Sequence, residues 1–440
     1  MTDSPVDEAH LHIVIINRWR EHYADYAAYV DHVSHRVTYI STEVGLGSVP
    51  DGAADVVLVD ATDDLSQARA AMAELVRWHG VPYRLVGLKE DDLLVAARLR
   101  EDWDIPGARP ADVIRWRDKF LMCQAVDNAG LPVPRFAAVT GRQSVLDFAK
   151  SAGWPLVLKP RIGSSSAGVT VVTGPDDLGG VPFDQPMLVQ AFNPHPIHHV
   201  DGIFDGGKLA DWKVSRYVNT CLGFRDGSFL GSVEEDDPQV NQAVESAATA
   251  FLGALTDAPT PFHLEVFVER GADDVTCGFL EVGARIGGAE IPFIWRDLHG
   301  YDPMRAAFDL QMGRGLVAER QGPDTGEVGG WLLIPAPAAR PCRITEATSM
   351  VDRRPGPYAE ALLSPGEVLP AADAYYEHVG GRFRFRGRSS AEVEAALVAT
   401  AAGFRVTAEP LAPVDGIEVS DAIELVEPTD QINVRREATR

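Results

Sequence analysis

The stretch from Phe262 to Gly288 has the pattern of a β-hairpin with two acidic residues on one face. Apolar residues occupy every second position in its first part, which is the period of a strand. With the turn centred near Asp273, Glu265 and Glu281 lie directly opposite each other. Two like charges in such a pair are destabilising unless a cation lies between them, and Mg²⁺ prefers carboxylate oxygens. The hairpin therefore predicts a divalent-cation site, and the competing interpretation is a solvated strand face. Strict alternation in the second strand would put four residues on one face: Phe279, Glu281, Gly283 and Arg285.

The net charge of the chain limits the classes of partner that it can bind. Its 440 residues include 64 acidic and 40 basic side chains, a formal net charge of −24. Nucleic-acid binding needs a basic face, so we expect no nucleic-acid partner. No apolar run is long enough to span a bilayer, and the acidic, polar N-terminus is unlike a signal peptide. The length predicts two or three domains, and we expect no membrane association.

The four cysteines lie far apart in the chain and form no C-x-x-C pair. This spacing argues against a thiolate zinc site and against a disulfide framework. It is typical of proteins in a reducing compartment, so we expect a cytoplasmic protein.

Residues 11–100 alternate short apolar runs with amphipathic stretches. Strands are expected over 11–16, 36–40, 55–59 and 83–88, and helices over 24–32, 64–79 and 90–99. This alternation predicts a parallel sheet covered by helices. The turn after the first run lacks the G-x-G-x-x-G of a dinucleotide site, so no NAD site is expected. Arg18 and Arg20, which follow that run, could hold a carboxylate, although solvated side chains explain them more simply.

A phosphate-binding region is indicated in the middle of the chain. One helix is expected over 112–129, with Lys119 inside it, and a buried strand ends in Lys159. Burying the charged side chain of a lysine at the end of an apolar strand costs free energy unless the lysine binds an anion. The glycine- and serine-rich loop from Gly163 to Gly168 offers backbone N–H groups that suit a polyphosphate. A plain hairpin turn would explain the glycines but not the lysine, and the spacing is not that of a P-loop.

The closely spaced His195, His198 and His199 suggest a metal site. Pro194 and Pro196 stiffen this segment, however, so the histidines are not expected to share a helix face. We therefore predict no zinc site here.

Four sequence motifs appear in an order that resembles the ATP-grasp superfamily over roughly residues 110–300. They are R-D-K, V-L-K-P-x-x-G-S-S-x-x-G-V, F-H-L-E and E-V-x-A-R-I-G-G. The R-I-G-G ending is similar to the L-amino acid ligases and carnosine-synthase-like enzymes. The resemblance implies an α/β fold, α+β in the ATP-grasp part, with a Rossmann-like parallel sheet domain first. Its expected domains are residues 1–112, a central lid domain over 113–193, and a C-terminal antiparallel-sheet domain over 194–440.

The resemblance also implies roles for particular residues. Glu265 and Glu281 are expected to bind Mg²⁺, or Mn²⁺ in its place, and Arg285 to bind the transferring phosphoryl group. The expected catalytic residues are Arg285, Lys159 and Glu281. The expected ATP-binding residues are Lys119, Lys159, Gly163, Ser164, Ser165, Ser166, Gly168, Val169, Gln190, Ala191, Phe192 and His198.

The activity implied is that of an ATP-dependent carboxylate–amine ligase. It would activate a small carboxylate, an amino acid or a related acid, as an acyl phosphate and join it to an amine, releasing ADP and phosphate. The partners implied are small acid and amine substrates and a second copy of the chain in a homodimer. Alternatives are a carboxylase, an acid–thiol ligase and a nucleotide-binding regulator without catalysis. The R-I-G-G ending counts against the carboxylase, and the complete set of lysines, glutamates and arginine counts against the regulator.

The chain departs from the superfamily pattern at two places. Gly283 stands where the superfamily often has an asparagine that binds metal. The strip that usually contacts the ribose with acids contains none from Gln190 to His199. His198 is the expected neighbour of the sugar, and the alternative is an acid from elsewhere, Glu234 or Glu235.

Overall fold

The N-terminal part is a parallel sheet covered by helices, as the alternating pattern predicted. The computed structural model describes residues 10–19, 23–316, 322, 324–371, 379–411 and 434–436, so Arg20 lies outside it. The strands are β1 (His12–Asn17), β2 (Arg36–Ser41), β3 (Asp55–Leu58) and β4 (Arg84–Gly87), in the order β3-β2-β1-β4. Strand β20 (Val434–Arg436) pairs with β3 and so returns the chain end to this sheet. The helical elements are α1 (Tyr26–Tyr29), η1 (Glu43–Ser48), α2 (Leu65–His79), η2 (Glu90–Asp92) and α3 (Leu93–Asp102).

The helix predicted over residues 112–129 is broken in the structure. Its pieces are α4 (Pro110–Val113), η3 (Ile114–Trp116) and α5 (Lys119–Asn128). The break occurs at Asp118, whose carboxylate caps α5 by accepting from the backbone N–H groups of Phe120 and Leu121. The break places Lys119 at the start of a helix, where its backbone N–H donates to the carbonyl of Arg161 at 2.8 Å.

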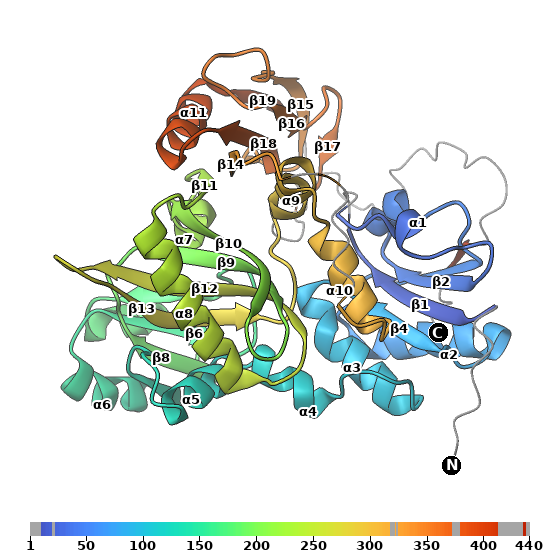
Figure 1. Cartoon of the computed structure of the whole chain (residues 1–440), viewed down its shortest axis with the longest axis horizontal. Helices are drawn as coiled ribbons and strands as arrows, with labels where there is room; N and C mark the ends of the chain where they lie inside the picture. Colours follow the sequence, from blue (N-terminus) through green and yellow to red (C-terminus); the bar gives the residue numbers. More distant parts are fainter. Residues whose placement is uncertain are drawn as a thin grey trace.

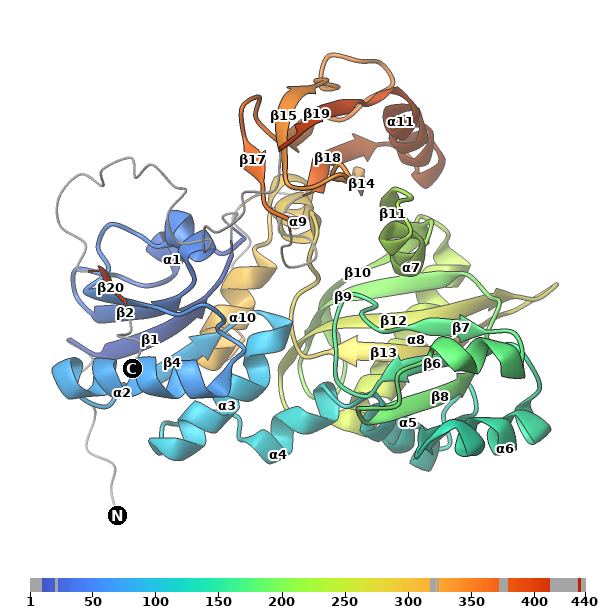
Figure 2. The same cartoon turned by 180° about the vertical axis from the view of Figure 1, so that it is seen from behind.

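A small antiparallel sheet follows, in the order β5-β8-β6-β7. Its strands are β5 (Phe136–Val139), β6 (Leu156–Pro160), β7 (Thr170–Val172) and β8 (Met187–Ala191). Helix α6 (Arg142–Ala152) and the turn η4 (Pro175–Gly180) pack against it through a separate hydrophobic core. Figure 2 shows this sheet beside the larger one, with the glycine-rich loop between β6 and β7.

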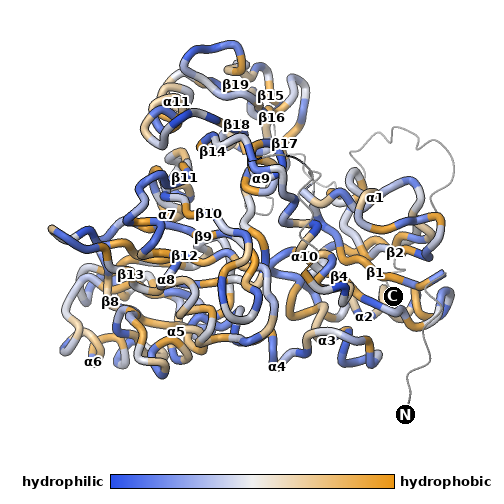
Figure 3. Tube along the Cα trace, viewed as in Figure 1, coloured by the Kyte–Doolittle hydropathy of each residue, from blue (hydrophilic) through white to orange (hydrophobic). Residues whose placement is uncertain are grey.

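The largest sheet, seen in Figure 1, has the order β13-β12-β9-β10-β11-β14-β18-β16. Each pair of neighbouring strands in it is antiparallel. Its strands are β9 (Ile197–Phe204), β10 (Leu209–Val218), β11 (Leu230–Glu234), β12 (Thr260–Arg270), β13 (Val275–Gly283), β14 (Val328–Pro335), β16 (Ala359–Leu362) and β18 (Val379–Gly387). Helices α5 and α8 (Pro238–Leu255) cover one face through an apolar core, and α7 (Cys221–Arg225) connects β10 to β11. The tip of the β12–β13 hairpin is hydrophilic and extends beyond the sheets (Figure 3). The parallel and antiparallel sheets confirm the predicted α/β class.

Two helices after the hairpin connect the large sheet to the N-terminal sheet. They are α9 (Ile291–His299) and α10 (Pro303–Gln311). The side chain of Gln311 donates to the carbonyl of Gly87 on β4 at 2.8 Å and accepts from its N–H at 3.0 Å. The end of the chain adds a sheet in the order β17-β15-β19 and one helix: β15 (Cys342–Ala347), β17 (Val368–Leu369), β19 (Val406–Pro410) and α11 (Ser390–Gly403). None of the helices in the described ranges is both long and apolar enough to cross a membrane.

Candidate active site

The acidic hairpin has the register that the sequence predicted. Glu265 on β12 pairs directly with Glu281 on β13. The register shifts at this point, because Val266 pairs with Phe279 and leaves Leu280 as an extra residue, a β-bulge. The bulge corrects one expectation. Phe279 is fully buried in the core instead of sharing the face of Glu281. Without the extra residue, Glu265 would pair with Leu280 and the two carboxylates would not be opposed.

The paired glutamates line a cavity of about 270 Å³ between the small and the large sheet. Eleven of the predicted site residues line it: Lys119, Lys159, Gly163, Ser164, Ser166, Val169, Gln190, Ala191, Phe192, Glu265 and Glu281. Apolar side chains from both sheets also line the cavity. The lining of the cavity thus combines apolar and strongly charged side chains, as a nucleotide with a triphosphate requires.

The two lysines differ in their surroundings. Lys159, at the end of β6, is 3% exposed, and its burial lowers the pKa of the ammonium group although Glu281 opposes that shift. The ammonium of Lys119 donates to the carbonyl of Gly163 at 2.9 Å and lies 3.6 Å from Glu281 Oε2. Both positive charges therefore line the same cavity as the two carboxylates, and Lys119 is directly paired with one of them.

The glycine-rich loop has the backbone of a tight turn. Ser165 and Ser166 have φ of 54° and 55°, and Gly168 has φ of 70°. A Cβ on Gly168 would lie 2.8 Å from Pro160 Cγ, so only glycine fits there. The loop is held by Arg225 of α7, whose Nε donates to the carbonyl of Ser165 at 2.7 Å.

Arg285 contacts the N-terminal part of the chain. Its Nε donates to Glu90 Oε2 at 2.6 Å, and Arg117 binds the same carboxylate and that of Asp91. Burial raises the pKa of Glu90, but the two guanidinium groups outweigh it and hold that pKa at about 2. Ser164 in turn donates to Asp91 at 3.3 Å. A chain of charged contacts therefore joins the glycine-rich loop to Arg285.

The structure corrects the prediction for His198. Its side chain is 5% exposed and lies 3.5 Å from Glu235 Oε2, and it does not line the cavity. Neighbouring residues of a strand point to opposite faces, so Ile197 lines the cavity and His198 points away. Glu234 accepts from the backbone of Gly329 and lies 2.8 Å from His299, so neither acid proposed as an alternative lines the cavity.

The three clustered histidines do not come together. His195 lies 3.4 Å from Glu269, His198 faces Glu235, and His199 binds Asp201. Among the described residues, these three histidines therefore have three separate acidic partners.

The opposed glutamates fit a divalent cation. They offer oxygen ligands alone, which is the donor set that Mg²⁺ and Mn²⁺ prefer. Glu265 and Glu281 are also the only carboxylates among the described residues that line the cavity. The other end of the cavity, near Phe192, Asn193 and Ile197, is lined by neutral side chains.

Sequence reasoning missed a buried network beside Glu265. Asp201 binds both His199 and His263. Burial lowers the pKa of His263, but the negative charge of Asp201 outweighs burial and raises that pKa to about 9. Tyr217 donates to Glu265 Oε1 at 2.7 Å. His263 could have been found, because it shares the strand face of Glu265 in the period-two pattern. Asp201 gave no local signal, since it lies 62 residues from His263.

Comparison with known proteins identifies the architecture. No family model matches the chain. The chain is 25% identical over 253 residues to the L-arginine-specific L-amino acid ligase of Bacillus subtilis, covering 54% of this chain. It spans 59% of the length of that relative.

Two solved structures share the fold over most of the chain. The L-amino acid ligase from Bacillus licheniformis has a TM-score of 0.71 at 17% identity, covering 91% of this chain and 99% of the other. A biotin carboxylase domain dimer of the Hydrogenobacter thermophilus 2-oxoglutarate carboxylase, with MgADP and bicarbonate, has a TM-score of 0.64 at 13% identity, covering 91% of each chain. The shared architecture shows that the chain has the ATP-grasp fold, and over part of its length its sequence is similar to that of an L-amino acid ligase.

Proposed function

We propose that this protein joins a small carboxylic acid, an amino acid or a related acid, to an amine and converts ATP to ADP and phosphate. One observation carries the proposal. Glu265 and Glu281 face each other in the same cavity as Lys119 and Lys159. Phosphoryl transfer depends on positioning and on neutralising charge, and this arrangement supplies both.

Each group has a distinct task in the proposed reaction. Lys119 and Lys159 neutralise phosphate oxygens, and the glycine-rich loop excludes water from an acyl phosphate that water would hydrolyse. Arg285, oriented by Glu90, binds the oxygens of the acyl phosphate. The amine then attacks the carbonyl carbon, the C–N bond forms as the C–O bond to phosphate breaks, and the amine loses a proton. A bound Mg²⁺ would supply further charge neutralisation at the phosphates through the two glutamates.

A matrix of acids and amines tests the proposal. The wild-type protein is incubated with ATP, Mg²⁺ and each acid–amine pair; phosphate release is measured, and products are identified by mass spectrometry. Chromatography of the spent nucleotide separates an acyl phosphate route, which gives ADP, from an adenylate route, which gives AMP. Stoichiometric AMP would contradict the acyl phosphate. ADP formation that needs bicarbonate and no amine would favour the carboxylase alternative.

The resemblance also supports a homodimer in the cytoplasm. The four cysteines, Cys123, Cys221, Cys277 and Cys342, are all free, which suits a reducing compartment. Light scattering of the purified protein measures the proposed dimer directly, and a monomer at micromolar concentration would contradict it.

A further inference from the structure

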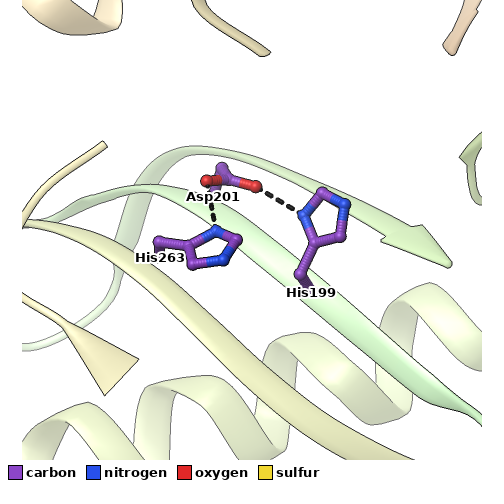
Figure 4. Close-up of side chains that lie close together, drawn as sticks. All are labelled: His199, Asp201 and His263. Atoms are coloured by element: carbon purple, nitrogen blue, oxygen red, sulfur yellow. Dashed lines mark hydrogen bonds and ion pairs between the residues drawn. The ribbon is translucent and has the colours of Figure 1, made fainter. Parts of the chain in front are cut away.

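A buried polar cluster lies beside Glu265. Its centre is the carboxylate of Asp201 on β9, which is 3% exposed. This carboxylate accepts from His199 Nδ1 at 2.6 Å and from His263 Nδ1 at 2.8 Å (Figure 4). It also accepts from the backbone N–H of Gly287 at 3.0 Å. One carboxylate thus joins β9, β12 and the loop that follows β13.

The cluster is held by hydrogen bonds and is not itself arranged around a metal. Ligand atoms of Asp201, His199 and His263 lie within 4.8 Å of one another. A zinc ion would bind such atoms at about 2.0 to 2.2 Å and keep them more than about 3 Å apart. The distances of 2.6 and 2.8 Å are those of direct hydrogen bonds, in which both imidazoles donate from Nδ1 to the carboxylate.

His263 connects the cluster to the metal-binding candidate on the same strand. Its Nε2 lies 3.8 Å from Glu265 Oε1, and the hydroxyl of Tyr217 donates to the same oxygen at 2.7 Å. Both of these contacts are made to Oε1, so they leave Oε2 available to a cation. The hydrogen bond from Tyr217 and the neighbouring ring of His263 hold one oxygen of the carboxylate in place, which orients the other oxygen for a metal.

Gly287 connects the cluster to the loop of Arg285. A Cβ on Gly287 would lie 2.2 Å from Asp201 Oδ1 and 2.9 Å from His263 Nδ1, so a side chain cannot be accommodated. The backbone two residues after Arg285 is therefore packed directly on the Asp201–His263 pair. This contact gives a physical reason for glycine after Arg285-Ile286.

We propose that Asp201 and His263 are positioning residues: through Glu265 they set the affinity for a divalent cation, and through Gly287 they fix the loop of Arg285. This inference rests on the proposed function only in taking Glu265 as a metal ligand. Neither residue needs to touch a substrate for this role.

Direct Mn²⁺ binding tests the inference without relying on turnover. Free Mn²⁺ is measured by electron paramagnetic resonance during titration of the full chain and of Asp201→Asn. We expect Asp201→Asn to bind Mn²⁺ about tenfold to a hundredfold more weakly, the scale for groups that orient metal ligands. The matched control is Asp55→Asn, since Asp55 is 1% exposed and lies 3.0 Å from His79 Nε2 in the N-terminal sheet. It should bind Mn²⁺ as the wild type does.

A second pair of variants separates positioning from folding. His263→Gln retains a side-chain donor, whereas His263→Ala removes it. The affinity for Mn²⁺ should therefore fall less in His263→Gln than in His263→Ala, and the melting temperatures of the two variants should be similar. If Asp201→Asn does not fold, the two His263 variants still test whether this cluster sets the affinity for Mn²⁺. Wild-type Mn²⁺ affinity in folded Asp201→Asn, or in both His263 variants, would overturn the inference. Failure of the proposed function looks different: no acid–amine pair would stimulate phosphate release, while Mn²⁺ binding would still depend on Asp201.

Discussion

The carboxylate of Glu90 occupies the space that a side chain at position 283 would fill. A Cβ on Gly283 would lie 2.3 Å from Glu90 Oε2, the same oxygen that accepts from Arg285 at 2.6 Å. The glycine at the place where the superfamily often has asparagine therefore has a steric explanation. The N-terminal part of the chain supplies a carboxylate there, and that carboxylate orients Arg285.

Gly283→Ala should consequently displace Glu90 and Arg285. We expect turnover to fall by about a hundredfold, the effect of misplacing a positioning group by about 1 Å. Gly278→Ala on the same strand is the control, because the atoms nearest its Cβ are 4.0 Å away. Phosphate release measures both variants. Equal turnover in Gly283→Ala and Gly278→Ala would show that the position of Glu90 does not matter for the reaction.

The two glutamates should respond differently to replacement by alanine. Either change should lower kcat about a hundredfold or more, because charge stabilisation in the transition state is lost. The side chain of Glu281 is 36% exposed, so in Glu281→Ala the loss of its ion pair with Lys119 and the relief of repulsion from Glu265 should largely offset each other and leave the melting temperature close to that of the wild type. Glu265→Ala should lower it, because the hydroxyl of Tyr217 loses its acceptor. Calorimetry with steady-state kinetics checks both, and equal melting temperatures in the two variants would contradict this assignment.

The sequence predicted the elements of the fold well because their signals are local. The strands of the N-terminal sheet and the two strands of the acidic hairpin follow from the spacing of apolar residues. The β-bulge at Leu280 could not be predicted, since strict alternation is the only rule available without a partner strand. The opposition of Glu265 and Glu281 was predicted correctly from a turn near Asp273, although the bulge is what produces it.

Contacts between segments that lie far apart in the chain could not be predicted from the sequence. Glu90 meets Arg285 across 195 residues, and nothing near either residue identifies the other. His198 was assigned to the ribose because the strip from Gln190 to His199 contains no acid. Neighbouring residues of a strand point to opposite faces, and in the structure Ile197 lines the cavity instead. Burial of Lys159 was predictable, because it closes an apolar strand.

Weak selection for the 2′-hydroxyl of the nucleotide is a further prediction. The cavity end formed by Phe192, Asn193 and Ile197 is neutral, and the described residues that line the cavity include no acid apart from the two glutamates. A single neutral hydrogen bond contributes only about 1 kcal/mol, so ATP and 2′-deoxy-ATP should differ in kcat/KM by no more than about tenfold. Steady-state kinetics with both nucleotides measures this ratio. A preference for ATP of about a thousandfold or more would show that a buried polar partner does read the hydroxyl.

Asp92 provides a test of stability against pH. It is 0% exposed and accepts from the hydroxyl of Thr62 at 2.8 Å. Burial raises the pKa of Asp92 to about 6, although Arg18 nearby opposes the shift. Between the ordinary value of 3.8 and about 6, the folded protein therefore binds more protons at this residue than the unfolded chain does. The contribution of Asp92 to the free energy of unfolding must fall as pH rises through this window.

Asp92→Asn should remove that dependence, because the amide keeps an acceptor for Thr62 and does not titrate. The free energy of unfolding of the variant relative to the wild type should rise by on the order of 1 to 3 kcal/mol between about pH 4 and about pH 7. Denaturant unfolding at several pH values measures the difference, with the exposed Asp184→Asn as a control whose profile should run parallel to the wild type. A constant difference between Asp92→Asn and the wild type across this range would mean that Asp92 does not titrate there. The pH dependence of stability would then have to come from other groups.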